Sequence, residues 1–367
     1  MKKIKIARVC PYYYEKKENL DSGLKPYYYN LIKELEKNNI KNDIYTLESD
    51  SDKDNVIIIP RRRRFSYLLF GYDVYKNLKD KEYNIIHTHQ TSAFLLYFFK
   101  KKLKAKFVHT IHGSPLAYKK VPIKSLTTFK DVIYFYLFNK YICKRADAII
   151  TVSSEARDEV IKNLKINENK VSFIPTGVDV SLFKEKKTNK DIDILYVGRF
   201  ATKKNLLNFI RIIYKLKSNL PNIKAYLIGG VKTDLDYYNI INFINELKLK
   251  ENVVLIPPVN NYKISDYYNR AKIFMLLSYE EGLPKVLLEA MACGVIPITS
   301  NNSGMKDVII NGKNGYLVDI KNHDEIINKI IELLNNNKLK IEKDYIKNNF
   351  SWKIITQKII KLYNKIL

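Results

Sequence analysis

Short apolar runs rich in β-branched residues alternate with longer stretches of helical periodicity along the whole chain. Strands separated by helices of this length need right-handed β-α-β connections, so the pattern predicts an α/β fold with parallel sheets. The 367 residues exceed the usual size of one hydrophobic core, and the pattern occurs in two series. We therefore expect two doubly wound domains.

The expected strands of the two series are residues 4–10, 56–59, 84–88, 106–111, 148–152 and 171–174, then 192–197, 225–228, 253–256, 273–277, 295–299 and 315–318. Helical patterns between them include 27–38, 206–216, 237–247 and 286–293. A polar, lysine-rich stretch, 181–190, separates the series and is interpreted as a linker. The expected domains are 1–180 and 191–351, followed by a C-terminal helix, 352–367, that packs back on the first domain.

The formal net charge of +26 indicates an anionic partner. The chain carries no helix-turn-helix, RRM or zinc-finger signature, which disfavours nucleic acid. Four consecutive arginines, 61–64, precede an apolar aromatic stretch, 65–70, and together they favour contact with an anionic membrane surface. The same apolar residues fit a helix buried against the core of the first domain equally well.

Three cysteines far apart in the chain, without a CxxC pair, argue against a disulfide framework or a structural zinc site. The N-terminal apolar stretch is broken by Lys5 and Arg8 and is typical of a strand rather than a signal peptide. No run reaches the roughly 20 apolar residues that span a bilayer. We expect a cytoplasmic protein, or one held peripherally on the inner face of the cell membrane.

The most informative segment is SYEEGLPKVLLEAMACG, residues 278–294. Pro284 suits the first turn of a helix, and Gly294 suits its end. Glu281 precedes this helix and Glu289 lies about two turns inside it, an interval of roughly 12 Å if helical, too long for one glycosidase-type acid/base pair. Two such carboxylates can contact two ends of an extended ligand, while the helix N-terminus attracts an anion. The alternative is an ordinary amphipathic helix with a solvated Glu289.

A second cluster follows the strand at 192–197. Gly198 lets the chain turn, and Arg199, Lys203 and Lys204 lie beside the start of a helix. Cations at a helix N-terminus suit a diphosphate. The alternative is that Lys203 and Lys204 are solvated, as most of the 64 basic residues are expected to be.

These motifs resemble the signature of the retaining GT-B glycosyltransferases of family 4. The spacing of Glu281 and Glu289 within EEGLPKVLLEAMACG is similar to the family's paired glutamates. IPTGVD at 174–179, with Phe183, resembles the interdomain PxGVDxxxF element, and LIGG at 227–230 resembles a glycine turn of the second domain. Asn205 departs from the pattern, since the family usually has glycine after the lysine. The resemblance covers residues 171–294 and continues through 302–318, whereas the N-terminal half matches more loosely.

The resemblance implies the GT-B fold, with two Rossmann-like domains facing a central cleft. It implies transfer of a sugar from a nucleotide-diphosphate sugar to a glycan or lipid-linked acceptor, with retention of configuration, in cell-surface polysaccharide or glycolipid synthesis. The N-terminal domain would bind the acceptor and the C-terminal domain the donor. Arg199 and Lys204 would stabilise the leaving diphosphate, Glu281 would orient the sugar, and Glu289 would bind the ribose. Further donor contacts are assigned to Gly198, Gly282, Leu283 and Pro284.

Candidates in the first domain are fewer. Family members often place a histidine at a strand end near the donor sugar, which points to His112, directly before Gly113. His109 lies inside the strand pattern and fits a structural role equally well, while His87 and His89 stay undecided. The glycine-rich loop that the family places near the donor phosphates is represented only by Gly23.

Two DxD triplets, 191–193 and 234–236, match the metal-binding motif of another glycosyltransferase fold. The first leads into a strand, and the resemblance implies that cationic side chains and helix ends replace a metal, so we expect no metal or other cofactor. Two competing functions are a basic membrane- or nucleic-acid-binding protein without catalysis and a GT-B-like sugar-nucleotide epimerase or phosphorylase. The Glu281 and Glu289 element together with Arg199 and Lys204 favours the transferase.

Overall fold

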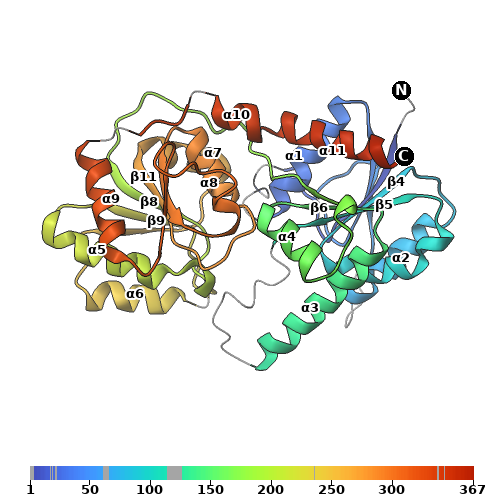
Figure 1. Ribbon diagram of the computed structural model, residues 1–367, viewed down its shortest axis with the longest axis horizontal. Coiled ribbons are helices and arrows are strands. Elements are labelled where there is room, and N and C mark those ends of the chain that lie inside the picture. Colours follow the sequence, from blue (N-terminus) through green and yellow to red (C-terminus); the bar gives the residue numbers. More distant parts are fainter. Residues whose placement is uncertain are drawn as a thin grey trace. The chain divides into compact units, whose positions relative to one another are not determined.

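The computed structural model describes residues 4–16, 18, 20, 23–60, 66–113, 126–234, 236–336, 339–342 and 344–367. The chain forms two compact units (Figure 1). The first comprises Met1–Thr176 together with Trp352–Leu367, and the second comprises Gly177–Ser351. The arginines at 61–64, with Phe65, lie outside the described residues, so the membrane contact expected there stays a prediction. Phe70 is buried in the core of the first unit, which fits the alternative of a helix packed on that core.

The first unit contains a parallel sheet of seven strands in the order β3-β2-β1-β4-β5-β6-β7. Its elements are β1 (Lys5–Val9), α1 (Lys25–Lys37), β2 (Lys41–Thr46), β3 (Val56–Ile58), α2 (Ser66–Leu78), β4 (Ile85–His89), η2 (Thr91–Lys102), β5 (Lys106–Ile111), α3 (Leu126–Arg145), β6 (Ala148–Thr151), α4 (Ser154–Lys162), η4 (Glu168–Lys170), β7 (Val171–Phe173) and α11 (Trp352–Ile366).

The second unit contains a parallel sheet of six strands in the order β10-β9-β8-β11-β12-β13. Its elements are β8 (Ile192–Val197), η5 (Thr202–Lys204), α5 (Leu206–Asn219), β9 (Ala225–Ile228), α6 (Tyr237–Glu246), β10 (Val253–Ile256), α7 (Asn261–Arg270), β11 (Ala271–Leu276), α8 (Lys285–Ala292), β12 (Ile296–Ser300), η6 (Ser303–Met305), β13 (Tyr316–Val318), α9 (His323–Asn335) and α10 (Tyr345–Phe350).

The expected fold class, two doubly wound parallel-sheet domains, is confirmed. β2 was not predicted from the sequence, because KNDIYT begins with three polar residues. The structure gives two of them partners: Asn42 accepts a hydrogen bond from Arg8, and Asp43 pairs with Lys5. Polar residues within a buried strand therefore conceal it from a hydrophobicity pattern.

Alternating residues of the first sheet face two separate cores. Ile6 and Ile85 belong to the core formed with α1 and α11, whereas Ala7 and Ile86 belong to the core formed with α2, η2 and α3. The C-terminal helix α11 thus belongs to the first unit, where the side chain of Trp352 packs against Tyr27 with ring centroids 5.1 Å apart.

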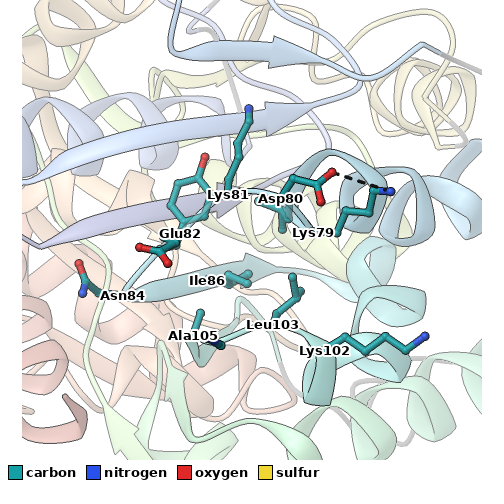
Figure 2. Close-up of a pocket in the computed structure, with 12 residues that line it drawn as sticks. Lys79, Asp80, Lys81, Glu82, Asn84, Ile86, Lys102, Leu103 and Ala105 are labelled. Carbon is teal, nitrogen blue, oxygen red and sulfur yellow. Dashed lines mark ion pairs between the residues drawn. The ribbon is translucent and has the colours of Figure 1, made fainter.

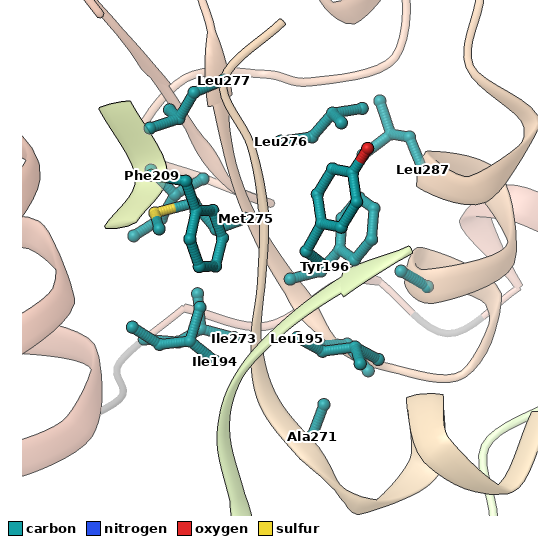
Figure 3. Close-up of a cluster of buried hydrophobic side chains, with 14 of the residues drawn as sticks. Ile194, Leu195, Tyr196, Phe209, Ala271, Ile273, Met275, Leu276, Leu277 and Leu287 are labelled. Atoms are coloured by element: carbon teal, nitrogen blue, oxygen red, sulfur yellow. The ribbon is translucent and has the colours of Figure 1, made fainter. Parts of the chain in front are cut away.

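The second core is built around the two central strands β8 and β11 (Figure 3). Ile194, Leu195 and Tyr196 of β8 and Ile273 of β11 are fully or almost fully buried, as expected for strands covered on both faces. This packing holds the carboxyl ends of β8 and β11 side by side.

The division between the units differs from the expected linker. It falls between Thr176 and Gly177, and residues 181–190 belong to the second unit. There Phe183 is buried against Tyr268, and the backbone N–H of Lys186 donates to Asn269 Oδ1 at 2.7 Å. The lysine-rich composition predicts an exposed linker, yet these contacts fix the stretch to the second unit.

A cavity of about 620 Å³ lies at the amino ends of β4 and β5 (Figure 2). Its walls carry four lysines and two acidic residues, one pair of which, Lys79 and Asp80, approaches to 3.8 Å. Ligands of open α/β sheets bind at the carboxyl ends of strands. This cavity lies at the opposite end of the sheet and contains none of the predicted site residues.

No helix among the described residues is long and apolar enough to cross a bilayer.

Candidate functional site

The strand order of the second sheet places a topological switch point between β8 and β11. Neighbouring connections leave in opposite directions at such a point, which opens a crevice outside the carboxyl ends of the two strands. The segments after β8 and β11 are residues 198–205 and 277–284. These are the two segments that the sequence singled out for binding an anionic donor.

Hydrogen bonds join the two segments directly. The N–H of Tyr279 donates to the carbonyl of Lys203 at 2.8 Å, and Asn205 Nδ2 donates to the carbonyl of Leu277 at 3.2 Å. Lys204 Nζ forms an ion pair with Glu281 Oε1 across 77 residues of sequence. Two of the predicted catalytic residues are therefore brought into contact.

Glu281 is almost completely buried, with 7% of its surface exposed. Burial by itself would raise the pKa of its carboxyl group, but Lys204, Lys203 and the hydroxyl of Ser278 outweigh this effect and hold the pKa below its usual value. Ser278 Oγ donates to Oε1 at 2.9 Å, the same oxygen that pairs with Lys204. Oε2 has no hydrogen bond with the described residues, so this carboxylate oxygen can accept one from a ligand.

Polar residues of the following strand support the Glu281 segment. Ser300 Oγ and Asn302 Nδ2 each donate to the carbonyl of Ser278 at 2.8 Å, and Asn302 Nδ2 also donates to the carbonyl of Tyr279 at 3.0 Å. Sequence reasoning missed these supports. The available signal was the cluster of short polar residues that ends β12 at the edge where the site lies.

Arg199 is exposed, and its guanidinium takes part in no ion pair or hydrogen bond with the described residues. Its backbone is fixed, because Tyr196 Oη donates to its carbonyl at 2.9 Å. Gly198 adopts φ +154°, and a Cβ on Gly229 would lie 2.9 Å from the carbonyl oxygen of Gly198. The close approach of these two strand-end glycines holds the Arg199 turn and leaves its cation available to an anion.

Asn205 adopts a left-handed conformation, with φ 57° and ψ 39°. Glycine and asparagine are the residues that adopt this region most readily. The departure from the family pattern at this position is therefore conservative, since asparagine meets the same backbone requirement as glycine and adds the side-chain bond to Leu277.

We expect Asn205→Gly to be more stable than Asn205→Ala by roughly 1 kcal/mol, since alanine is strained in the left-handed region and this strain exceeds the entropy that glycine adds to the unfolded chain. Urea unfolding of both variants measures the difference. Asn163, whose φ is −90°, is the matched control position, where alanine should be at least as stable as glycine. A more stable Asn205→Ala would contradict the role assigned to the backbone.

Glu289 is buried rather than solvated, with 3% of its surface exposed. Tyr268 Oη donates to Oε2 at 3.0 Å, and Lys285 Nζ lies 3.1 Å from Oε1. Pro284 is the N-cap of α8 rather than part of its first turn, so Glu289 lies little more than one turn inside the helix and not two. A buried, oriented carboxylate of this kind is more typical of a binding site than of a solvated helix face.

Gly282 and Leu283 lie in the segment between Glu281 and the N-cap of α8. The first N–H groups of an α-helix have no acceptor within the helix, and the helix dipole favours an anion there. The start of α8 thus lies between the two glutamates along the chain.

The two DxD triplets have local structural partners. Asp191 pairs with Arg270 at 2.6 Å, and Asp193 pairs with Lys272 at 2.7 Å. Asp234 accepts hydrogen bonds from the N–H groups of Phe200 and Val231. These aspartates stabilise the fold of the second unit.

Three histidines of the first unit, His87, His89 and His112, cluster beside Arg8. Arg8, His87, His89 and His109 are fully buried, and His89 Nδ1 lies 3.2 Å from His112 Nε2. Burial lowers the pKa of His109 and His112 to about 3, and lowers the pKa of His87 and His89 well below the usual value. All four rings are therefore neutral at pH 7.

His112 lies directly after β5, at the carboxyl end of that strand, and unlike His89 at the end of β4 it is partly exposed. His109 is enclosed within β5, where its Nδ1 lies 2.9 Å from Thr88 Oγ1, which fits a structural role. Gly23 is exposed in a turn before α1 with φ +64°. Sequence reasoning gave Arg8 no role in a site, although a charge within an otherwise apolar central strand was the available signal.

Family models match most of the chain. Residues 178–352 match the model described as Glycosyl transferases group 1, and residues 22–182 match the model described as Glycosyltransferase Family 4. The two matched ranges meet near the division between the two structural units.

Two relatives with named activities are similar over most of their length. The UDP-Gal:alpha-D-GlcNAc-diphosphoundecaprenol alpha-1,3-galactosyltransferase of Escherichia coli is 29% identical over 73% of this chain and 70% of its own. The capsular polysaccharide biosynthesis glycosyltransferase CapM of Staphylococcus aureus is 28% identical over 92% of this chain and 93% of its own.

The structure is similar to that of sucrose-phosphate synthase from Thermosynechococcus elongatus, with a TM-score of 0.80 and 20% identity over 99% of each chain. Identity at this level shows the fold alone, and that fold is GT-B.

Proposed function

Because the chain belongs to the glycosyl transferases group 1, we propose that it is a retaining glycosyltransferase that moves a hexose-type sugar from a nucleoside-diphosphate sugar to an acceptor hydroxyl. The observation that carries the proposal is the contact between Lys204 and Glu281 at the carboxyl ends of β8 and β11. It joins a cation suited to phosphate and a carboxylate suited to sugar hydroxyls at the switch point of the second sheet.

The leaving diphosphate gains negative charge as the glycosidic bond breaks. In this proposal Arg199 and Lys204 meet that charge, together with the first N–H groups of α8. Arg199 is the cation with no carboxylate partner, while Lys204 also neutralises Glu281. Such groups are positioned before the reaction and need no reorganisation during it, which is how fixed charges accelerate a transfer.

The two glutamates bind the two ends of the donor in this proposal. Oε2 of Glu281, which is free of hydrogen bonds with the described residues, accepts from a sugar hydroxyl. Glu289 accepts from the ribose hydroxyls, with its carboxylate held by Tyr268 and Lys285. The length of a sugar nucleotide explains why the two carboxylates are separate residues rather than one acid/base pair.

Retention follows in this proposal from attack on the face from which the diphosphate departs. The acceptor oxygen forms the new bond to the anomeric carbon as the bond to the diphosphate breaks. The departing phosphate oxygen takes the acceptor proton. No protein nucleophile is needed, so the residues act by binding and electrostatic stabilisation.

The relatives suggest the acceptor class. The name of the Escherichia coli relative specifies UDP-galactose and a diphosphoundecaprenol-linked sugar, and that of the Staphylococcus aureus relative specifies capsular polysaccharide biosynthesis. For this chain we propose a lipid-linked or glycan acceptor used at the inner face of the cell membrane. The net charge of +26 supports contact with an anionic lipid surface.

The deciding experiment tests donor binding and transfer together. Purified protein is mixed with UDP-, GDP- and ADP-sugars, and the shift in melting temperature identifies the donor. The shifted donor is then incubated with an undecaprenyl-diphosphate-linked sugar, and the anomeric configuration of the product is read by NMR. We expect one nucleotide class to stabilise the protein and an α-linked product from an α-configured donor. Inverted product would overturn retention, and no shift with any sugar nucleotide would overturn the donor site.

Glu289→Gln and Arg199→Ala should each lower the transfer rate at least tenfold while the protein stays folded, because each removes a charge-assisted contact to the donor. The rates are measured with the donor found above, alongside circular dichroism. Glu246→Gln changes an exposed carboxylate at the end of α6 and serves as the matched control. Wild-type rates in both site variants would remove these residues from the donor site.

Transfer should persist in EDTA, because Arg199, Lys204 and the start of α8 provide the positive charge that a metal supplies in other glycosyltransferases. The measurement compares initial rates in EDTA with rates after added magnesium or manganese. Activity that disappears in EDTA and returns with either ion would contradict the metal-free mechanism.

A further inference from the structure

The guanidinium of Arg8 contacts two histidine rings, and no carboxylate of the described residues pairs with it. Nη1 lies 2.9 Å from Nε2 of His89 and 3.3 Å from Nδ1 of His87. Nη2 lies 3.3 Å from Asn42 Oδ1 and 3.2 Å from the hydroxyl of Tyr363. A guanidinium carries only donors and stays protonated at any physiological pH. Each of the four partners must therefore accept a hydrogen bond from Arg8.

This constraint decides where His89 carries its proton. Its Nε2 accepts from Arg8, so the single proton of the neutral ring is on Nδ1. Nδ1 lies 3.2 Å from Nε2 of His112, and it therefore donates to that nitrogen. His112 Nε2 is an acceptor, which leaves the proton of the neutral His112 ring on Nδ1.

The other protonation states conflict with the same contacts. A proton on His89 Nε2 would point at an Arg8 N–H group, donor against donor. A proton on His112 Nε2 would require His89 Nδ1 to accept, which moves the His89 proton back onto Nε2 and restores the same conflict. Burial, which lowers the pKa of both rings, also disfavours a doubly protonated state.

We propose that Arg8 and His89 are positioning residues that hold His112 as its Nδ1–H tautomer. In this tautomer His112 presents an N–H group to the bound sugar nucleotide and cannot act as a base. This inference rests on the proposed function for the substrate that His112 meets. His112 Nδ1 has no hydrogen bond with the described residues, and the residue is partly exposed directly after β5. Its N–H can donate to a sugar hydroxyl or to a phosphate oxygen of the donor.

In this proposal His112 takes part in binding the sugar nucleotide but not in proton transfer. A ring that carries its proton on Nδ1 and engages Nε2 with His89 cannot accept the proton of the incoming hydroxyl, so that proton goes to the departing phosphate. His112 then acts on the donor by orienting it and by stabilising negative charge on an oxygen.

His87 supplies an internal comparison. Its Nδ1 is the acceptor, 2.6 Å from the hydroxyl of Tyr363 and also facing Arg8, and its Nε2 lies 2.7 Å from Thr110 Oγ1. The same Arg8 therefore imposes the opposite tautomer, Nε2–H, on His87. The two outcomes cannot both arise from a general preference of buried histidines.

The test is a long-range ¹H–¹⁵N NMR spectrum of the ligand-free, histidine-labelled protein at pH 7, which distinguishes protonated from unprotonated ring nitrogens. We expect Nδ1–H for His89 and His112 and Nε2–H for His87. A wild-type His112 protonated on Nε2, or a mixture of tautomers, would overturn the proposal without any variant being made.

Arg8→Met tests the cause. Without the guanidinium of Arg8, the His112 signals should change from one tautomer to a mixture. The apparent affinity for the sugar nucleotide should then fall in proportion to the remaining Nδ1–H fraction. If this variant does not fold, His89→Leu interrupts the same series of hydrogen bonds at its second member and has the same expected result. Asn42→Ala removes a partner of Arg8 that is not part of the hydrogen-bond series Arg8–His89–His112, so the His112 tautomer should stay unchanged. The proposal would be refuted by an unaltered His112 tautomer in folded Arg8→Met or His89→Leu. It would also be refuted by a mixture of His112 tautomers in Asn42→Ala.

The spectra do not depend on transfer activity. If His112 shows Nδ1–H but no sugar nucleotide binds, the proposed function fails and the tautomer assignment stands. If transfer is observed and His112 carries Nε2–H, the positioning role fails and the transferase stands.

Discussion

Lys204→Met should lower the transfer rate at least a hundredfold, because removing one fixed donor to a developing anion typically has an effect of 10²–10³ on the rate. The same change removes the ion-pair partner of Glu281, whose side chain is 9% exposed. Leaving a buried charge without its partner is expected to lower the free energy of unfolding by about 3 kcal/mol. Initial rates and urea unfolding measure the two effects separately.

A double-mutant cycle distinguishes catalysis from stability. Glu281→Gln in the Lys204→Met background removes the uncompensated charge, so most of the lost stability should return. The rate should stay low, because both the cation that meets the diphosphate and the carboxylate that orients the sugar are missing. Lys272→Met breaks a partly exposed pair with Asp193 on the same unit and should change the stability by about 1 kcal/mol, less than the buried pair does. A double variant that regains both stability and rate would reduce Lys204 and Glu281 to structural partners of each other.

Acid should destabilise the first unit well above the pH at which its carboxylates titrate. His109 is fully buried with a pKa of about 3, whereas an unfolded histidine has a pKa near 6.5. Between these values the unfolded chain binds the extra proton, so stability decreases as the pH falls from 6.5 toward 3. At pH 5 this single residue accounts for about 2 kcal/mol, and the lowered pKa values of His87, His89 and His112 act in the same direction.

The measurement is urea unfolding at pH 7 and pH 5, followed by the fluorescence of Trp352. This residue is the one tryptophan of the chain and belongs to the first unit, so its signal reports on the unit that holds the histidines. His109→Gln should reduce the loss of unfolding free energy between pH 7 and pH 5 by the about 2 kcal/mol attributed to His109. An unfolding midpoint that stays constant from pH 7 to pH 5 would mean that the histidines are not buried neutral groups in solution.

The main departures from the sequence-based predictions occur where polar residues are buried. β2 was not predicted because Asn42 and Asp43 resemble loop residues, yet their side chains bond to Arg8 and Lys5. The lysine-rich stretch 181–190 resembles a linker, yet Phe183 and backbone bonds to Asn269 fix it to the second unit. A hydrophobicity pattern counts the polarity of a residue but contains no information on the partner that satisfies it.

What the sequence determined by itself is the α/β class, the two-domain organisation and the motifs around Glu281, Glu289, Arg199 and Lys204. These depend on local periodicity and on spacing along the chain, and both are written in the residue order. Only the tertiary structure decided that Lys204 contacts Glu281, and that Arg8 reaches His89, because these pairs lie 77 and 81 residues apart. Contacts of that kind arise when parallel strands bring their carboxyl ends together, and the burial that results sets which groups are charged and which nitrogens carry protons.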